Sequence, residues 1–347
     1  MQAIDTIIAT DIMNVALDHY VKGQPFMQSM TDKPLLKALK KETFSGGLGL
    51  VSIPVQGKFM DAQPGFFHGY EEDDAVVFKQ AMNVDRAKYK WYEHHAGLII
   101  TETELKKDGI SVTDDMKTSE HSQSSVHQLV KILKNRLADF GESWSRALHN
   151  NLWMGPTNPK TAPGLLTIIT GTPTTDMVGG ISSTANTWWQ TRAAGHIPAS
   201  ESLQTLTKFL RSEVRQLRKF GGKPNTCLCG SKFLAALEGE IQAKGYYTDS
   251  GFSGKKNELG MSDISLTGLG TFIYDPWLDD HAMSDRCYIF DNDKIKMYVM
   301  EGEENKVRNP TRPYDYFIFL RSMTTTYCLG SKQQNSNAVY QTDPVVA

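Results

Sequence analysis

The chain has 347 residues, which is long enough for one large domain or two moderate ones. Hydrophobic residues make up 40% of it and charged residues 22%, an ordinary globular composition that excludes wholesale disorder. The net charge is −2, and no basic excess or basic stripe is visible, which argues against a dedicated DNA-binding protein. We interpret the densest basic group as a solvated face, with weak contact to a polyanion as the alternative. That group is Lys33, Lys37, Lys40 and Lys41.

Cysteine usage and hydropathy bear on the compartment. The four cysteines are sparse, and the C-x-C pair Cys227 and Cys229 is too close for a common zinc-site spacing. We therefore expect small apolar core residues in a reducing compartment. No Lys or Arg precedes the first apolar stretch, and no apolar run reaches the roughly 20 residues that span a bilayer. We expect a soluble chain made in a cytoplasm, with no membrane partner.

The first 110 residues are predicted to be extended rather than compact. Residues 1–45 are largely polar and weakly periodic, as in an arm that lies on another surface. Residues 46–110 combine short β-favouring stretches with a tip rich in turn formers, which predicts a long β-hairpin. Such a ribbon is too thin to hold a core, so we expect its partner to be another subunit. Deleting about residues 55–72 should then leave a folded subunit that assembles poorly.

Residues 119–149 form the strongest predicted helix of the chain. Apolar side chains recur there at steps of three and four, from Val126 to Leu148. A second helix is predicted over 200–220 with Gly221 closing it, and a third over 231–244. Strands are predicted over 165–170, 226–229 and 269–274.

The last third is predicted to be rich in β-strands. Residues 287–290 and 295–300 flank Asp291-Asn292-Asp293, which predicts a hairpin. A long apolar and aromatic strand, or strand pair, follows over 314–329, and the chain ends in a polar tail rich in Asn and Gln.

The sequence contains no recognisable catalytic, cofactor or metal motif. The phosphate-loop, dinucleotide, nucleophile-elbow and H-E-x-x-H patterns are absent. His94 and His95 are adjacent on a predicted strand and point to opposite faces, so they cannot chelate one metal together. Asp279, Asp280 and His281 could bind a metal, but a solvated loop is the favoured interpretation. We therefore predict no catalytic residue, no cofactor and no metal site.

Aromatic residues in the hairpin and in loops are instead the candidates for contacts. Tryptophan and other large aromatics carry much of the energy of interfaces, and the Trp188-Trp189 pair could anchor a loop into a core or a subunit interface. The candidate interface residues are Phe59, Phe66, Phe67, Trp91, Trp188, Trp189 and Trp277.

The order of these parts resembles a known family. The stretch from Gly180 to Trp189, the strand and helix within residues 224–237, and Phe272 to Trp277 followed by residues 287–297 are similar to segments of tailed-bacteriophage major capsid proteins. Encapsulins and the floor of herpesvirus capsids share that fold. The resemblance covers nearly the whole chain, although none of its motifs encodes chemistry.

The resemblance implies an α+β subunit with four parts. These are an N-terminal arm at 1–45, an extended β-hairpin loop at 46–110, a peripheral domain at 111–159 and 305–347 with a spine helix at 119–149, and an axial domain at 160–304. It implies a structural protein that self-assembles into hexamers and pentamers of an icosahedral head around double-stranded DNA, without sequence-specific binding. Expected further partners are a separate scaffolding protein, a portal and a decoration protein, and the expected location is the virion, assembled in the host bacterial cytoplasm.

Two other functions stay open on the sequence alone. An encapsulin-like compartment would enclose a protein cargo in place of a genome. An α/β enzyme would require a site that no motif identifies, with residues 275–281 as its best place.

Overall fold

A computed structural model describes residues 31–45, 49–59, 67–75, 78, 84–101, 103, 123–155, 158–200, 202–243, 264–266, 269–307 and 318–343. The chain divides into two compact units, Met1–Asp32 and Lys33–Ala347, and every helix and strand named below belongs to the second. Residues 1–30 of the predicted arm, and Phe66 of the hairpin, lie outside the described residues, whereas residues 31–45 of the arm include α2 (Pro34–Ala38) and β1 (Lys40–Phe44).

One sheet has six strands in the order β7-β15-β11-β8-β10-β9. Strands β15 and β7 are parallel, as are β10 and β8, while the other neighbours are antiparallel. The strands are β7 (Arg192–Ile197), β8 (Thr226–Cys229), β9 (Ile264–Leu266), β10 (Gly270–Tyr274), β11 (Arg286–Phe290) and β15 (Ala338–Thr342).

The two faces of this sheet bury different clusters. Alternate residues of one face, such as Cys227, Ile289 and Tyr340, pack with helices α6 (Thr205–Arg218) and α7 (Ser231–Ala243). The intervening residues, such as Leu228 and Tyr288, belong to a second core shared with the rest of the chain. This period of two is what a sheet buried on both sides requires.

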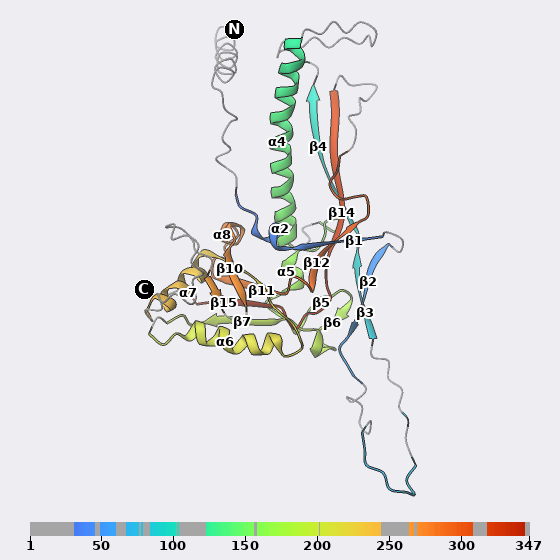
Figure 1. Cartoon of the computed structure of the whole chain (residues 1–347), viewed down its shortest axis with the longest axis vertical. Coiled ribbons are helices and arrows are strands. Elements are labelled where there is room, and N and C mark those ends of the chain that lie inside the picture. The colour runs from blue at the N-terminus through green and yellow to red at the C-terminus, as the bar shows by residue number, and fades with distance from the viewer. Residues whose placement is uncertain are drawn as a thin grey trace. The chain divides into compact units, whose positions relative to one another are not determined.

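A second sheet has five strands. Strand β14 (Ile318–Ser331) pairs antiparallel with β4 (Tyr92–Thr101), β12 (Ile295–Met300) and β13 (Lys306–Val307), and β1 (Lys40–Phe44) is parallel to β12. Figure 1 shows β4 and β14 running side by side, in a register that extends from Ile318 and Thr101 to Tyr327 and Tyr92. Of the strand or strand pair predicted over 314–329, the described residues 318–329 belong to one continuous strand, and residues 314–317 lie outside the described residues.

Helix α4 (Gln123–Trp153) occupies the place of the predicted helix over 119–149. Its last turns bury Leu148, Leu152 and Trp153 in the shared core. Short helices α2 (Pro34–Ala38) and α8 (Pro276–Asp280) also contribute to this core through Leu35 and Leu278. Among the described helices, none is both long and apolar enough to cross a membrane.

The predicted hairpin is present as strands β2 (Leu50–Gln56) and β3 (Val84–Lys90), paired antiparallel. Its base is not bare, because Val51, Ile53 and Tyr89 are buried in the chain's own core. Tyr89 also donates its hydroxyl to the Ser331 carbonyl at 2.9 Å and accepts from the Ser331 amide at 3.1 Å. The prediction that the whole ribbon depends on another subunit was therefore wrong for its base.

The segment predicted as a strand over 165–170 is instead a one-turn helix, α5 (Leu165–Ile168). Gly164 precedes it, and its carbonyl accepts the Thr167 hydroxyl at 2.6 Å. Leu165 and Ile168 are both buried, three residues apart on one side of the turn. A short apolar run fits a strand and a buried helical turn equally well, so periodicity could not decide between them.

The predicted hairpin at Asp291-Asn292-Asp293 was also wrong, although both of its strands exist. Strand β11 pairs with β15 and β8, whereas β12 pairs with β1 and β14, so the turn carries the chain from one sheet to the other. Similarly, the polar tail returns to the six-stranded sheet, where β15 lies between β7 and β11. This placement differs from the predicted division, which put 305–347 with the spine helix.

Candidate functional site

Most of the large exposed aromatic residues of the described chain lie between strands β2 and β3 of the hairpin, and Phe220 after α6 is the exception. Phe59 is 63% exposed, Phe67 96% and Phe78 92%. A turn follows Tyr70, in which the Glu71 amide donates to the Asp74 carboxylate at 2.9 Å. Phenyl rings left in water have no role in this chain's own core, so Phe59 and Phe67 stay predicted interface residues. Phe78 was not among the predicted interface residues, and its exposure adds it to them.

Trp188 and Trp91 are half-buried and contact other parts of the same chain. A Cβ atom added at Gly57 would lie 1.8 Å from Trp188 Cδ2, so the indole packs directly on the backbone at the end of β2. Trp91 lies 6.4 Å, between ring centroids, from Phe44 of β1. Both indoles therefore hold the hairpin and its neighbours in place.

Trp189 and Trp277 are core residues of the single chain. Trp189 is 2% exposed, belongs to the short 3-10 helix η2 (Thr187–Trp189), and donates Nε1 to the Val178 carbonyl at 3.0 Å. Trp277 is 7% exposed and stacks on Trp153 at 5.2 Å between ring centroids. Because both rings are already covered within the chain, they leave little surface for the predicted contact with another subunit.

A buried carboxylate joins the end of α4 to α8. Asp275 is fully buried and accepts hydrogen bonds from Trp153 Nε1 at 2.9 Å and from the Trp277 amide at 3.0 Å. His149 Nε2 lies 3.4 Å from the same carboxylate. Asp275 is also the N-cap of α8, so the Asp-Pro-Trp sequence positions a helix end against the long helix.

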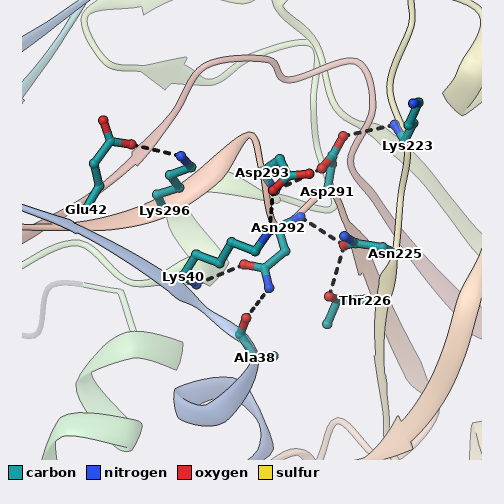
Figure 2. A network of polar contacts seen from close by, with 10 residues as sticks. All are labelled: Ala38, Lys40, Glu42, Lys223, Asn225, Thr226, Asp291, Asn292, Asp293 and Lys296. Carbon is teal, nitrogen blue, oxygen red and sulfur yellow. Dashed lines mark hydrogen bonds and ion pairs between the residues drawn. The ribbon is translucent and has the colours of Figure 1, made fainter.

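The turn between the two sheets is a second polar junction, shown in Figure 2. Asn292 Oδ1 accepts the Lys40 amide at 2.9 Å, and its Nδ2 donates to the Ala38 carbonyl. The Asn292 amide donates to Asn225 Oδ1 at 3.0 Å, just before β8. One side chain thus fixes β1 beside the point where the chain passes between the sheets.

Lys33, Lys40 and Lys41 of the basic group at 33–41 form ion pairs with other parts of the chain. Lys33 bonds Glu142 at 2.6 Å, Lys41 bonds Glu304 at 2.6 Å, and Lys40 is paired with Asp293. Glu42 of β1 pairs with Lys296 of β12 at 2.9 Å, and this hydrogen bond lowers the pKa of the Glu42 carboxyl. The interpretation as a merely solvated face was therefore incomplete, because these charges attach the segment to the chain's own body.

Two of the candidate catalytic and metal-binding residues, His94 and Asp279, make contacts within the chain. His94 stacks on Tyr327 at 4.8 Å between ring centroids, and burial lowers the pKa of its imidazole, while His95 is exposed. Asp279 accepts from the Ser231 amide at 2.9 Å and from the Tyr274 hydroxyl at 2.7 Å. In the part of the chain that the structure describes, no three His, Cys, Asp or Glu side chains form a metal-binding group.

The cysteines are buried, as the sequence predicted. Cys229 Sγ lies 3.1 Å from Cys287 Sγ across neighbouring strands β8 and β11. Burial raises the pKa of both thiols, and it raises the pKa of Cys328 to about 12. These thiols are inert at neutral pH, because thiolate is the reactive form.

Helix α6 carries a charged feature that the sequence-based prediction missed. Its four residues Lys208, Arg211, Arg215 and Arg218 are all exposed, at steps of three, four and three. That spacing places them along one side of the helix. The prediction that the chain has no basic stripe was therefore wrong, because the stripe follows helical spacing and is not a run in the sequence.

Comparison with known proteins identifies the fold. No family model matches the chain, and no curated protein matches its sequence. Solved structures do match: the capsid asymmetric unit of cyanophage A-1(L) is 14% identical with a TM-score of 0.58, and the match covers 92% of this chain and 96% of that chain. The capsid of Myoviridae phage XM1 is 10% identical with a TM-score of 0.58, covering 93% and 96%. The capsid of an empty GTA particle is 12% identical with a TM-score of 0.53, covering 92% and 99%.

The chain therefore has an α+β fold of the kind found in virus-shell subunits. More particularly, it is the fold of phage capsid proteins, as the resemblance in the sequence predicted, and the match extends over nearly the full length of both chains.

Proposed function

We propose that the chain is a major capsid protein, which assembles with copies of itself into the hexamers and pentamers of an icosahedral phage head enclosing double-stranded DNA. The observation that carries the proposal is the agreement of fold with phage capsid chains over 92% or more of this chain. The location that follows is the virion, and the shell would be assembled in the host cytoplasm with a separate scaffolding protein, a portal and a decoration protein.

The contacts of the described elements support a revised division into parts. The extended loop consists of β2, β3 and the residues between them. The peripheral part combines α4 with β4 and β14, which pair over ten residues. The axial part is the six-stranded sheet with α6 and α7, and it includes β15 because that strand pairs with β7 and β11.

The hairpin aromatics are the residues proposed to contact a neighbouring subunit. Phe59, Phe67 and Phe78 are exposed, while the base of the same hairpin is buried in the chain's own core. A rigidly held base with an apolar far end suits a heterologous contact, in which each subunit reaches the next around a closed ring.

Electron microscopy of the expressed full-length protein tests the proposal. Closed shells or hexameric sheets are expected, and a stable monodisperse monomer or dimer would overturn it. Nucleic acid inside native particles is expected, whereas particles that hold a protein cargo would indicate a compartment instead of a phage head.

A double variant, Phe59→Ser with Phe67→Ser, tests the contact residues separately. We expect an unchanged free energy of unfolding, since both rings are exposed, and a loss of shells. Met177→Ser is the control, because Met177 is 71% exposed but lies on β5 (Met177–Val178), outside the hairpin. A deletion in the hairpin should begin after Gly57, because the predicted deletion from 55 would also remove buried Val55 and the Trp188 contact.

A further inference from the structure

The solvent-facing side of α6 is positively charged and carries no acid. The exposed positions of the helix are Lys208, Arg211, Ser212, Arg215, Gln216 and Arg218. The opposite side is buried through leucines in the core beside the six-stranded sheet. The only acid of the helix, Glu213, points inward, where it pairs with Arg192 and accepts the Tyr340 hydroxyl at 2.8 Å.

The four cations on this face, the basic face, lie together on one helix without paired carboxylates, whereas other unpaired cations of the described chain, such as Lys88, Arg146 and Lys160, lie on separate segments. None of Lys208, Arg211, Arg215 and Arg218 forms an ion pair with any residue that the structure describes. Other cations do so, with paired carboxylates for Lys33, Lys40, Lys41, Arg192, Lys296 and Lys306. The basic face is therefore left with uncompensated charge.

Folding of the helix does not require this pattern. Like charges at spacings of three and four residues repel one another and destabilise a helix. The helix dipole favours Arg215 and Arg218 in the last turn, but it gives no such benefit to Lys208 near the N-terminal end or to Arg211 in the middle. A ligand that supplies negative charge would compensate all four.

We propose that this basic face contacts the phosphate backbone of double-stranded DNA. The inference rests on the proposed capsid function and adds to it the surface that meets the genome. From Lys208 to Arg218 the helix rises about 15 Å at 1.5 Å per residue. One strand of DNA presents a phosphate about every 3.4 Å, so the face matches roughly four phosphates. Ser212 and Gln216 lie between the cations and are also side chains that bind phosphate.

The chemistry of the face favours DNA over the acidic loop of a second copy. That loop, Glu71 to Asp74, follows the exposed Phe67 and Tyr70 and precedes the exposed Phe78. A protein segment with those rings would be expected to dock beside apolar surface. The exposed positions within α6 are all cationic or uncharged polar, and the exposed apolar side chains of Leu203 and Phe220 lie beyond its two ends, outside the basic face.

Such a contact is compatible with a shell that must fill and empty. Four phosphate contacts give weak, strongly salt-dependent binding with no sequence preference, since phosphates carry no base information. The net charge of the whole chain is −2, so the chain as a whole adds no general attraction for DNA to that of the basic face.

A salt titration with matched variants tests the proposal. Full-length subunits, kept unassembled at low concentration, are titrated against a fluorescent 30-base-pair duplex of random sequence, and anisotropy is followed at several salt concentrations. In the test variant, Lys208, Arg211, Arg215 and Arg218 are all replaced by Gln. Its slope of log affinity against log salt should be smaller by about three to four, and affinity at low salt should fall at least tenfold.

The control variant removes the same charge elsewhere, by replacing Lys88, Arg146, Lys160 and Lys232 with Gln. These residues are exposed and form no ion pair with the described residues, so the slope should stay close to that of the wild type. Equal effects in both variants would overturn the proposal in favour of a general charge effect. So would the absence of salt-dependent binding by the wild type.

Shell formation without DNA is measured in parallel, which separates this inference from the proposed function. Failure of the wild type to form shells counts against the capsid function, whatever the titration gives. If the test variant binds DNA normally but forms no shells, the face contacts another subunit and the DNA proposal is overturned. If the fourfold variant loses helicity by circular dichroism, Arg211→Gln with Arg215→Gln replaces it, with about half the change in slope expected.

Discussion

The indole Nε1 of Trp153 donates a hydrogen bond to Asp275 Oδ2 at 2.9 Å, and both residues are fully buried. Trp153 is the last residue of α4, and Asp275 is the N-cap of α8 after strand β10. The bond therefore ties the long helix to the six-stranded sheet. The stacked rings of Trp153 and Trp277, 5.2 Å apart, lie over the same connection.

Replacing Asp275 with Ala should lower the free energy of unfolding by about 2–4 kcal/mol. The change removes a helix cap and leaves the buried Trp153 N–H without an acceptor. Denaturant unfolding of unassembled subunits measures the loss. Asp280→Ala on the same helix is the control, because Asp280 is exposed, and it should change stability by less than about 0.5 kcal/mol. Equal losses in the two variants would contradict the role given to Asp275.

Replacing Gly57 with Ala should loosen the base of the hairpin. The new methyl group would lie 1.8 Å from Trp188 Cδ2, so the indole or the strand must move. Overpacking of this kind costs about 1–3 kcal/mol. Tryptophan fluorescence and thermal unfolding should both change. Gly69→Ala is the matched control, because nothing lies within 4 Å of a Cβ atom there, and unchanged fluorescence in both variants would rule out the contact.

The local sequence pattern was sufficient to predict helices and strands whose ends are set by neighbouring residues in the sequence. Strand β8 has the predicted bounds of 226–229, because four buried residues lie between Asn225 and Gly230. Gly221 has a φ of +80°, as expected for the residue that closes α6. Helix α4 was predicted from its apolar spacing, with bounds that shifted by about one turn.

Pairing between distant segments could not be predicted in this way. The turn at 291–293 has the local chemistry of a hairpin, yet β11 and β12 find better partners in different sheets. Asn337 of the polar tail is fully buried, and its amide oxygen accepts the Asp291 N–H at 3.2 Å. The two residues are 46 positions apart in the sequence, so no local pattern indicates this partner. The basic face of α6 was predictable, since its four cations recur in the sequence at steps of three, four and three, the spacing of one side of a helix.

Replacing Asn292 with Ala should release β1 from β12. The side chain makes two hydrogen bonds to the backbone of residues 38–40, and among the residues drawn in Figure 2 no other side chain bonds to that backbone. We expect faster hydrogen exchange in residues 40–44, measured by mass spectrometry, with a loss of about 1–2 kcal/mol in stability. Asp293→Ala removes only an exposed ion pair with Lys40, so exchange there should stay close to the wild type. Equal acceleration in both variants would assign the effect to the ion pair.

Ionisation of the cysteine thiols should leave the free energy of unfolding unchanged as the pH rises to about 9, and should lower it above that pH. Burial raises the pKa of Cys328 to about 12 in the folded chain, from 9.0 for the ordinary thiol. Between these values the unfolded chain loses a proton that the folded chain keeps, so the unfolded state binds fewer protons and stability decreases with rising pH. One such group contributes about 1.4 kcal/mol per pH unit. The other three cysteines act in the same direction, because the pKa of each is raised by burial.

The Cys328→Ala variant isolates one thiol in this pH dependence. Its absolute stability should be lower, because the side chain is buried, so the comparison is of slopes between pH 9 and pH 10.5. The slope of unfolding free energy against pH should be shallower than in the wild type by about 1.1 kcal/mol per unit over this range, because the unfolded thiol is only half ionised at pH 9. Urea unfolding at fixed pH steps gives both slopes. Parallel curves would mean that the pKa of Cys328 is the same in the folded and the unfolded chain. That outcome would contradict a pKa raised by burial of the thiol in the core.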